Sequence, residues 1–249
     1  MHTTLPTEGV MRGGGALGTP PCTHCPVRNR TICSGLGPAE LARVGAGAMD
    51  IRIAAGETLF TESEEARAFY TLTEGVIRLS RLLIDGRRQI TDFVFPGGFF
   101  GLTVSGRYDD TAEAVTDARL CRLSRAQLLR AARELPELDW KLLELTETDL
   151  AHARDHIVCL GRRSALERIA LFLVHLAGSA ADGSAAFDLK VPMTREDMAD
   201  YLGLTIETVS RGLAELRRRG VISLPSPKAI RVEAPRRLAV CAGLDPDMR

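Results

Sequence analysis

Apolar residues alternate with polar ones in short runs between residue 48 and residue 125. The alternation has the period of two that is typical of half-buried β-strands, and glycines separate the runs. The runs read DIRIA, ETLFTE, FYTLTEGVIRLSRLL, RQITDFVF and EAVTDARLCRLS. Strands at this spacing predict an antiparallel β-roll in the first half of the chain.

The pattern changes to a helical period after Pro136. Apolar or small residues then recur at alternating spacings of three and four, which is the seam of a coiled coil. We therefore predict a dimerisation helix over residues 136–160, with a helix that packs only against its own β-roll as the alternative. The predicted seam consists of Leu143, Thr146, Leu150, Ala153, Ile157 and Leu160.

Residues 193–220, MTREDMADYLGLTIETVSRGLAELRRRG, predict two short helices joined by a tight turn. Thr194 and Asp197 form a capping pair that begins the first helix, and Gly203 ends it. Thr205 caps the second helix. The stretch VISLPSPKAIRV that follows alternates around a Pro and Ser turn and predicts a two-stranded wing. Together these elements predict a winged helix-turn-helix.

The second helix has one buried and one exposed face. The predicted buried stripe is Ile206, Val209, Leu213 and Leu216. Glu207, Ser210 and Arg211 lie on another face, and these residue types suit the major groove. Arg donates to guanine, Glu accepts from cytosine, and Ser binds a base or a phosphate. An ordinary helical hairpin with a charged solvent face is the alternative, but the wing and the arginines at 217–219, which extend toward the phosphates, favour DNA binding.

A family resemblance becomes specific at this helix. The stretch LGLTIETVSRGLAELRRRGVI resembles the recognition region of the catabolite-activator superfamily, and Glu207, Ser210 and Arg211 match its fumarate-and-nitrate-reduction regulator (FNR) branch. The resemblance implies that these three residues read bases. It also implies that two copies of the helix bind an inverted repeat of TTGAT-type half-sites on double-stranded DNA.

The resemblance implies further partners. A regulator of this branch that activates anaerobic or microaerobic genes contacts RNA polymerase, and the hairpin at residues 84–88 lies where the family presents one such surface. A plain solvated turn is the alternative for this hairpin. We expect no binding of cyclic nucleotide, because the places that hold ribose and phosphate in nucleotide binders correspond here to Phe99 and Phe100, then Asp110 and Thr111. A carboxylate there would repel the phosphate.

Composition agrees with a globular chain of two domains, with 249 residues, 45% hydrophobic and 26% charged. The formal net charge is zero, yet residues 161–249 hold 14 Lys and Arg against 11 Asp and Glu, an excess of three positive charges. No apolar run reaches the roughly 20 residues that cross a bilayer, and the N-terminus lacks the order of a secretory signal. We therefore predict a cytoplasmic protein with no membrane partner.

Three of the six cysteines cluster in PCTHCPVRNRTIC, as Cys22, Cys25 and Cys33, and Cys121 lies in a predicted strand. Four thiolates complete either a zinc site or a four-iron cluster. Structural zinc usually takes paired motifs, so this spacing fits a cluster better, although zinc or free redox-active thiols stay open. A disulfide framework is disfavoured in a chain with no export signal.

The FNR resemblance favours the cluster, because that branch holds an oxygen-labile 4Fe-4S cluster with clustered N-terminal cysteines and one on the roll. The spacing Cys-x2-Cys-x7-Cys is similar to a variant found in regulators related to nitrogen fixation and microaerobic respiration. In this interpretation the intact cluster pins the N-terminal segment to the roll and favours the dimer.

The predicted fold is therefore α+β, and the predicted function is an oxygen-responsive, cluster-dependent transcription regulator. We divide the chain into a flexible lead at 1–20, a cluster-binding segment and β-roll at 21–135, the dimerisation helix at 136–160 and a DNA-binding domain and tail at 161–249. A cluster-carrying electron-transfer protein is a weaker alternative. We predict that the chain is no enzyme, since no nucleophile-base constellation or Gly-rich phosphate loop is evident.

Overall fold

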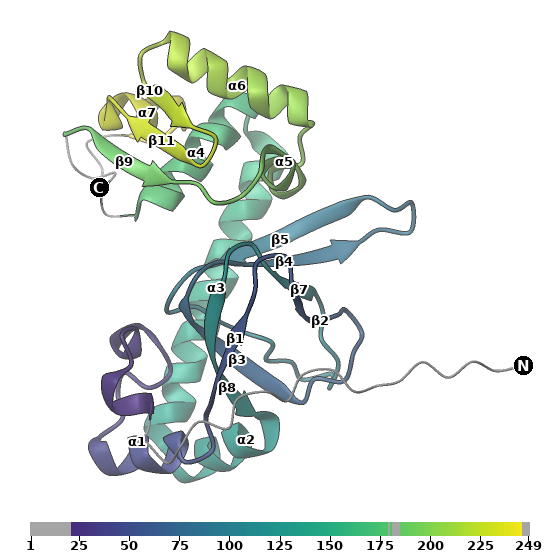
Figure 1. Ribbon diagram of the computed structural model, residues 1–249, viewed down its shortest axis with the longest axis vertical. Coiled ribbons are helices and arrows are strands. Elements are labelled where there is room, and N and C mark those ends of the chain that lie inside the picture. Colours follow the sequence, from purple (N-terminus) through teal and green to yellow (C-terminus); the bar gives the residue numbers. More distant parts are fainter. Residues whose placement is uncertain (1–20, 179, 181–184, 246–249) are drawn as a thin grey trace, which may run out of the picture.

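The computed structural model describes residues 21–178, 180 and 185–245, and the predicted flexible lead at 1–20 lies outside them. A β-roll and a winged helix-turn-helix domain lie at opposite ends of the molecule, and the long helix α3 runs beside the roll and connects the two (Figure 1). The predicted α+β fold is confirmed. No helix in the described part of the chain is long and apolar enough to cross a membrane.

The roll consists of two antiparallel sheets of four strands, in the orders β1-β8-β3-β6 and β2-β7-β4-β5. Their inward side chains form a buried core that includes Leu72, Ile77 and Leu120. The strands of the roll are β1 (Met49–Ile53), β2 (Thr58–Phe60), β3 (Ala68–Glu74), β4 (Ile77–Leu82), β5 (Arg88–Val94), β6 (Phe99–Phe100), β7 (Thr111–Ala114) and β8 (Ala118–Ser124).

Two glycines shape the turns of the roll. Gly75 joins β3 to β4 with φ +90°, and a Cβ at this position would come within 2.4 Å of the Asp117 carbonyl oxygen. Gly86 forms the β4–β5 hairpin turn with φ +84°, as the pair with Asp85 predicts. Only glycine adopts both conformations without strain.

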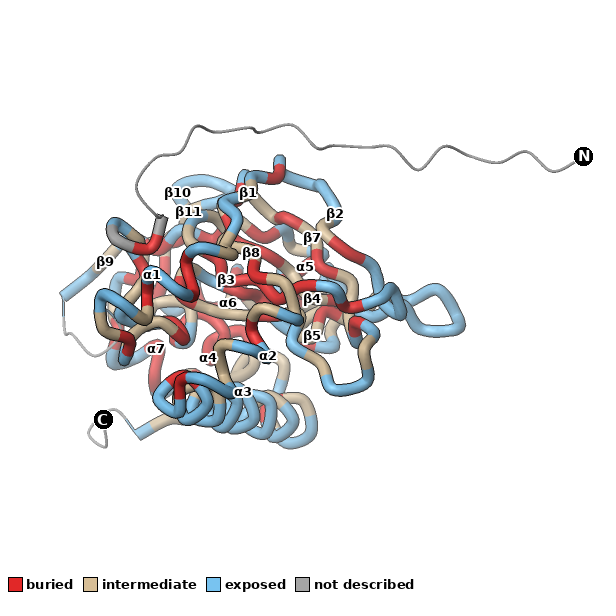
Figure 2. The backbone as a smooth tube through the Cα atoms, turned by 90° about the horizontal axis from the view of Figure 1, so that it is seen from below, coloured by how far each residue is buried: buried red, intermediate tan, exposed pale blue. Residues whose placement is uncertain are grey.

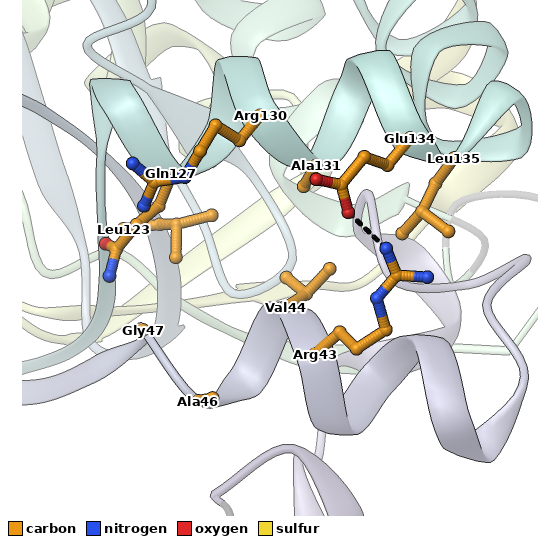
Figure 3. Close-up of a pocket in the computed structure, with 10 residues that line it drawn as sticks. All are labelled: Arg43, Val44, Ala46, Gly47, Leu123, Gln127, Arg130, Ala131, Glu134 and Leu135. Carbon is orange, nitrogen blue, oxygen red and sulfur yellow. Dashed lines mark hydrogen bonds and ion pairs between the residues drawn. The ribbon is translucent and has the colours of Figure 1, made fainter.

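Short helices cover one end of the roll, and the periodicity of the sequence did not reveal them. They are η1 (Pro21–His24), η2 (Arg28–Arg30), α1 (Pro38–Gly45) and α2 (Arg125–Glu134). Figure 3 shows α1 facing α2, with Val44 between them and an ion pair between Arg43 and Glu134. A buried cluster joins Cys22 and Ile32 of the N-terminal segment to Leu135 and Leu138 at the start of α3. The cysteine-bearing segment is thus packed against the base of the long helix.

The helix predicted from Pro136 is α3 (Pro136–Arg162). The C-terminal domain follows with α4 (Ala165–Ala177), β9 (Phe187–Lys190), α5 (Arg195–Leu202), α6 (Ile206–Arg218), β10 (Ile222–Ser226), β11 (Ala229–Val232) and α7 (Pro235–Cys241). The predicted wing is the pair β10 and β11, and β9 adds a third strand to it. Cys159 is buried in the core of this domain, and Cys241 packs partly against the same core.

The two domains share a buried core. Val76, Ile90 and Phe93 of the roll belong to the same apolar cluster as Met198 and Leu202 of α5. The ring of Phe93 also lies 5.2 Å from the ring of Tyr201, measured between centroids. The roll therefore contacts the helix-turn-helix directly as well as through α3.

Candidate nucleic-acid interface and cysteine site

The helix-turn-helix forms through the predicted local signals. The Thr194 hydroxyl accepts a hydrogen bond from the Asp197 amide at 3.0 Å, and the Asp197 carboxylate accepts from the Thr194 amide at 3.0 Å. Gly203 ends α5 in the left-handed conformation with φ +61°. Thr205 then caps α6 by accepting from the Thr208 amide at 3.3 Å. These bonds satisfy backbone groups at the helix ends, and the left-handed Gly203 allows the chain to turn between α5 and α6.

The inner face of α6 differs from the prediction at one position. Val209, Leu213 and Leu216 are buried as predicted, whereas Ile206 is 43% exposed. Its assignment to the buried stripe was wrong, because Ile206 is the first residue of α6 and only the later residues of the stripe belong to the buried core of the domain. An exposed isoleucine beside Glu207 instead belongs to the outer face of the helix.

The three predicted base-reading residues lie together on that outer face. Glu207, Ser210 and Arg211 are exposed, and Figure 1 shows α6 on the side of its domain away from the roll. Arg211 donates to the Thr208 hydroxyl at 3.1 Å. The backbone amide at the start of the helix, and next the Thr205 hydroxyl, lower the pKa of Glu207, so it is a carboxylate and an acceptor at neutral pH. The helix thus presents a donor and an acceptor side by side.

The arginines at the end of α6 are not equivalent. Arg218 donates to the Glu215 carboxylate at 2.8 Å, and Arg219 donates to it at 2.7 Å. This shared carboxylate offsets part of the positive charge that the sequence predicts there. Arg217 is exposed at the same end of the helix.

The four predicted cysteine ligands line one cavity. Cys22, Cys25 and Cys33 come from the N-terminal segment, and Cys121 from β8 reaches the same cavity of about 310 Å³. Thr71 and Arg119 complete its wall on the side of the roll. His24 also lines the cavity, with an exposed side chain. The fold therefore brings residues almost 100 positions apart to one place.

The surroundings of these thiols are apolar enough to shift their ionisation. Burial, and then the charge of Cys22, raises the pKa of Cys33 to about 11 and that of Cys121 to about 12. Burial, followed by the charge of Cys25, also raises the pKa of Cys22. Cys22, Cys33 and Cys121 are therefore protonated thiols at neutral pH when no metal is bound, so a metal that binds them must displace protons.

A buried cation lines the cavity beside the four cysteines. Across residues 21–178, 180 and 185–245, no three His, Cys, Asp or Glu side chains converge closely enough to hold a single metal ion. The Nε of Arg28, which lines the cavity, is buried with no hydrogen-bond partner. A group carrying the negative charge of four thiolates would complement it.

The predicted dimerisation seam is an exposed stripe on α3. Leu143, Leu150 and Ile157 are 59%, 48% and 68% exposed, Ala153 is also exposed, and Leu160 is half-buried. Figure 2 shows α3 at the edge of the molecule with most of its residues exposed. The seam thus faces outward rather than into its own roll. Of the two histidines on this helix, His152 is exposed, whereas His156 is half-buried against Tyr201.

The β4–β5 hairpin separates its two arginines. Arg87 is exposed at the tip and pairs with Asp85 at 2.8 Å. Arg88 instead contacts α5, where it pairs with Asp200 at 2.7 Å and with Asp197 at 3.0 Å. Arg88 was therefore wrongly assigned to the exposed tip. The sequence carries no signal for this contact, because a charge pair across 109 positions has no local pattern.

Aromatic side chains pack in the interior of the roll around Phe100, which is one of the residues compared above with nucleotide binders. Phe100 packs 5.6 Å from Tyr70 and 6.0 Å from Phe60, measured between ring centroids. The Asp110 carboxylate lies beside Thr91, whose hydroxyl donates to it at 3.0 Å. Phe99 pairs with Thr71 across the sheet.

Comparison with known proteins agrees with both halves of this architecture. Residues 50–134 match the family model of the cyclic nucleotide-binding domain, and residues 167–241 match that of the Crp-like helix-turn-helix domain. The chain is 42% identical over 204 residues to the nitrogen fixation regulation protein FixK of Bradyrhizobium diazoefficiens, covering 82% of this chain and 86% of that protein. The chain belongs to the CRP/FNR family of transcription regulators.

Other members of the family extend the similarity. The transcriptional activator protein FnrL of Cereibacter sphaeroides is 35% identical over 237 residues, with 91% of this chain and 93% of that protein covered. The structure of FixK2 from Bradyrhizobium japonicum matches with a TM-score of 0.72 and 36% identity, covering 80% of this chain and 97% of that one. The chain is thus a DNA-binding regulator of a family whose members typically dimerise, and these relatives are regulators rather than enzymes.

Proposed function

We propose that the chain is an oxygen-responsive transcription activator that holds a 4Fe-4S cluster with Cys22, Cys25, Cys33 and Cys121. The observation that carries this proposal is the cavity that all four thiols line. The unpaired Nε of Arg28 supports an anionic group.

The proposed signal follows the contacts of the N-terminal segment. When bound, the cluster would supply sensitivity to oxygen, because oxidation would release the four cysteines from one another. Cys22 packs in the same buried cluster as Leu135 and Leu138, at the start of α3. Cys121 lies on β8, which ends at the Ser124 cap of α2. Holding these cysteines together would stabilise one position of α3 and thereby the exposed seam.

The proposed output is operator binding by a dimer. Two copies of α6 would place Glu207, Ser210 and Arg211 in successive major grooves of a TTGAT-type inverted repeat. Activation, by analogy with the relative named as a transcriptional activator, would require contact with RNA polymerase, for which the exposed Arg87 hairpin is our candidate surface. A cytoplasmic location and the absence of a cyclic-nucleotide ligand belong to the same proposal.

Iron and acid-labile sulfide analysis of protein purified without oxygen tests the proposal. We expect about four irons and four sulfides per chain and a visible absorption that air bleaches. Cys121→Ala should lose the iron, the sulfide and the visible absorption. Cys241→Ala should keep them, because Cys241 lies on α7 away from the cavity. Colourless protein that contains zinc or no metal would overturn the cluster and leave the DNA-binding assignment intact.

A further inference from the structure

Strands β4 and β5 of the roll lie against α5 of the helix-turn-helix (Figure 1). Three ion pairs cross this contact. Arg78 of β4 pairs with Asp197 at 2.6 Å, and Arg88 of β5 pairs with Asp197 at 3.0 Å and with Asp200 at 2.7 Å. We call these four residues the interdomain clamp.

The clamp stabilises the buried charge of the Asp197 carboxylate. Its side chain is only 2% exposed, and burying a charge costs several kcal/mol unless it is paired and hydrogen-bonded. One carboxylate oxygen accepts from Thr194 in the cap of α5, and the other accepts from Arg78 and Arg88 of the roll. The helix cap and the domain contact therefore share one side chain.

The roll holds Arg78 in place. Its guanidinium also pairs with Glu113 of β7 at 2.5 Å, so Arg78 bridges a carboxylate of each domain. Apolar contacts surround the clamp, because Ile90 and Phe93 of the roll share a buried cluster with Met198 of α5. The orientation of α5 is thus defined by charge pairs with specific directions as well as by packing.

We propose that Arg78 and Arg88 are positioning residues for DNA binding, and that the clamp holds the helix-turn-helix in its DNA-competent orientation. In the clamped arrangement the reading face of α6 is exposed on the side away from the roll. The short turn at Gly203 joins α5 to α6, so fixing α5 also fixes α6. A symmetric operator requires two reading helices at a defined separation, and free rotation of each domain would reduce the fraction of dimers that meet it.

Operator affinity of Arg88→Ala tests the proposal, with Arg81→Ala as the matched control. Arg81 lies on the same hairpin but pairs with Asp110 of the roll. Fluorescence anisotropy should show Arg88→Ala binding a TTGAT-type operator at least about fivefold more weakly, with Arg81→Ala equal to wild type. The same anaerobic samples are checked by sedimentation, so that the comparison is made between dimers.

Two further readouts separate positioning from other roles. Arg88→Ala should leave the slope of log affinity against log salt unchanged, because it removes no phosphate contact. Asp200→Ala, which leaves the Arg88–Asp197 pair in place, should weaken binding no more than Arg88→Ala does. The double variant should bind no more weakly than Arg88→Ala alone, because Arg88→Ala already removes the contact with Asp200. Thermal melting of each variant verifies that the domains remain folded.

Wild-type affinity for Arg88→Ala would overturn the proposal, as would tighter binding, which would mean that the clamp holds an inactive orientation. A salt slope reduced by about one would assign Arg88 to a phosphate instead. Additive losses in the double variant would show that Arg88 and Asp200 act separately and would also contradict the clamp. The proposal rests on the proposed operator binding by a dimer. Iron content and sedimentation, measured on the same samples, distinguish failure of the cluster or the dimer from failure of the clamp, since the clamp predicts a difference between Arg88→Ala and wild type at equal iron content and equal dimer fraction.

Discussion

The imidazole ring of His156 on α3 stacks on the phenol ring of Tyr201 on α5, with centroids 4.2 Å apart and planes 18° apart. Tyr201 also contacts Phe93 of the roll and Phe172 of α4. One side chain thus joins the proposed dimerisation helix, the roll and the helix-turn-helix. A change in the position of α3 would reach the DNA-binding domain through this aromatic cluster.

The stacking of His156 on Tyr201 predicts that the folded protein is less stable at acidic pH. Burial lowers the pKa of His156, the charges of His175 and Arg168 act in the same direction, and a hydrogen bond with the Tyr201 backbone opposes them. Because the folded pKa lies below the ordinary value of about 6.5, the unfolded chain takes up a proton first as the pH falls. This residue's contribution to stability is therefore present above that value and is lost as the pH falls through the folded pKa.

We expect His156→Phe to keep the ring contact with Tyr201 and to remove the loss of stability that protonation of His156 causes at low pH. Its free energy of unfolding should fall less than that of wild type between about pH 7.5 and about pH 5.5, by at most about 1.4 kcal/mol, because pH 5.5 lies about one unit below the ordinary pKa. Denaturant unfolding at several pH values measures it. His152→Gln, exposed on the same helix, is the control, and an identical pH dependence in His156→Phe and wild type would contradict the assignment.

Arg211→Ala should lower operator affinity by about tenfold or more and relax the base preference at one position of the half-site, because a bidentate arginine–guanine contact discriminates by about 1–3 kcal/mol. Arg218→Ala provides the comparison, since Arg218 already pairs with Glu215 and should matter little. Anisotropy titrations against wild-type and single-base-substituted operators measure both effects. A uniform loss on all sequences would assign Arg211 to the phosphate backbone.

Ile157→Glu should convert the dimer to a folded monomer that does not bind the operator. The side chain is 68% exposed in the single chain, so the substitution buries no charge there, whereas a carboxylate within a dimer seam would be desolvated. Val158→Glu, 54% exposed on the same helix but outside the seam, should remain dimeric. Sedimentation velocity distinguishes the two variants, and a dimeric Ile157→Glu would place the interface elsewhere.

The oxygen response has its own test in the wild-type protein. We expect a stable dimer without oxygen and a weaker one after exposure to air, because the anchored cysteines pack against the base of α3. Sedimentation of both preparations over a range of concentrations compares the dimer dissociation constants. Equal constants would remove dimerisation as the switch even if the cluster is present.

Arg87→Ala should reduce transcription from a target promoter while operator affinity stays at the wild-type value, because Arg87 lies at the hairpin tip and pairs only locally with Asp85. Reconstituted transcription with RNA polymerase, alongside anisotropy, separates the two activities. Arg88 has a different expected effect, because it contacts α5. Loss of operator binding in Arg87→Ala would argue against a polymerase contact.

Cyclic AMP should neither bind the roll nor raise its melting temperature. Phe100 packs against Tyr70 in the interior of the roll. We expect the Asp110 carboxylate to repel a phosphate, because the resemblance to nucleotide binders implies that Asp110 corresponds to a phosphate-binding position. Differential scanning fluorimetry with and without millimolar nucleotide measures the shift. A concentration-dependent rise in the melting temperature would show that these substitutions do not close the site.

The sequence by itself determined the elements that depend on neighbours along the chain. Thr194, Asp197, Gly203 and Thr205 defined the ends of α5 and α6 because helix capping and left-handed turns involve residues at most a few positions apart. The alternation of the roll strands and the apolar seam of α3 were evident for the same reason. The identity of the three base-reading candidates came from a motif within five residues.

Only the tertiary structure decided which distant groups meet. Packing exposed Ile206, stacked His156 on Tyr201 and directed Arg88 to Asp197, 109 positions away. It also brought Cys121 to the cavity of the N-terminal cysteines, which the resemblance implied and the spacing alone left open. The periodicity of a sequence indicates whether a residue is buried. Its contact partner, however, is determined by how whole helices and strands pack, and contacts between domains produce no periodic pattern in the sequence.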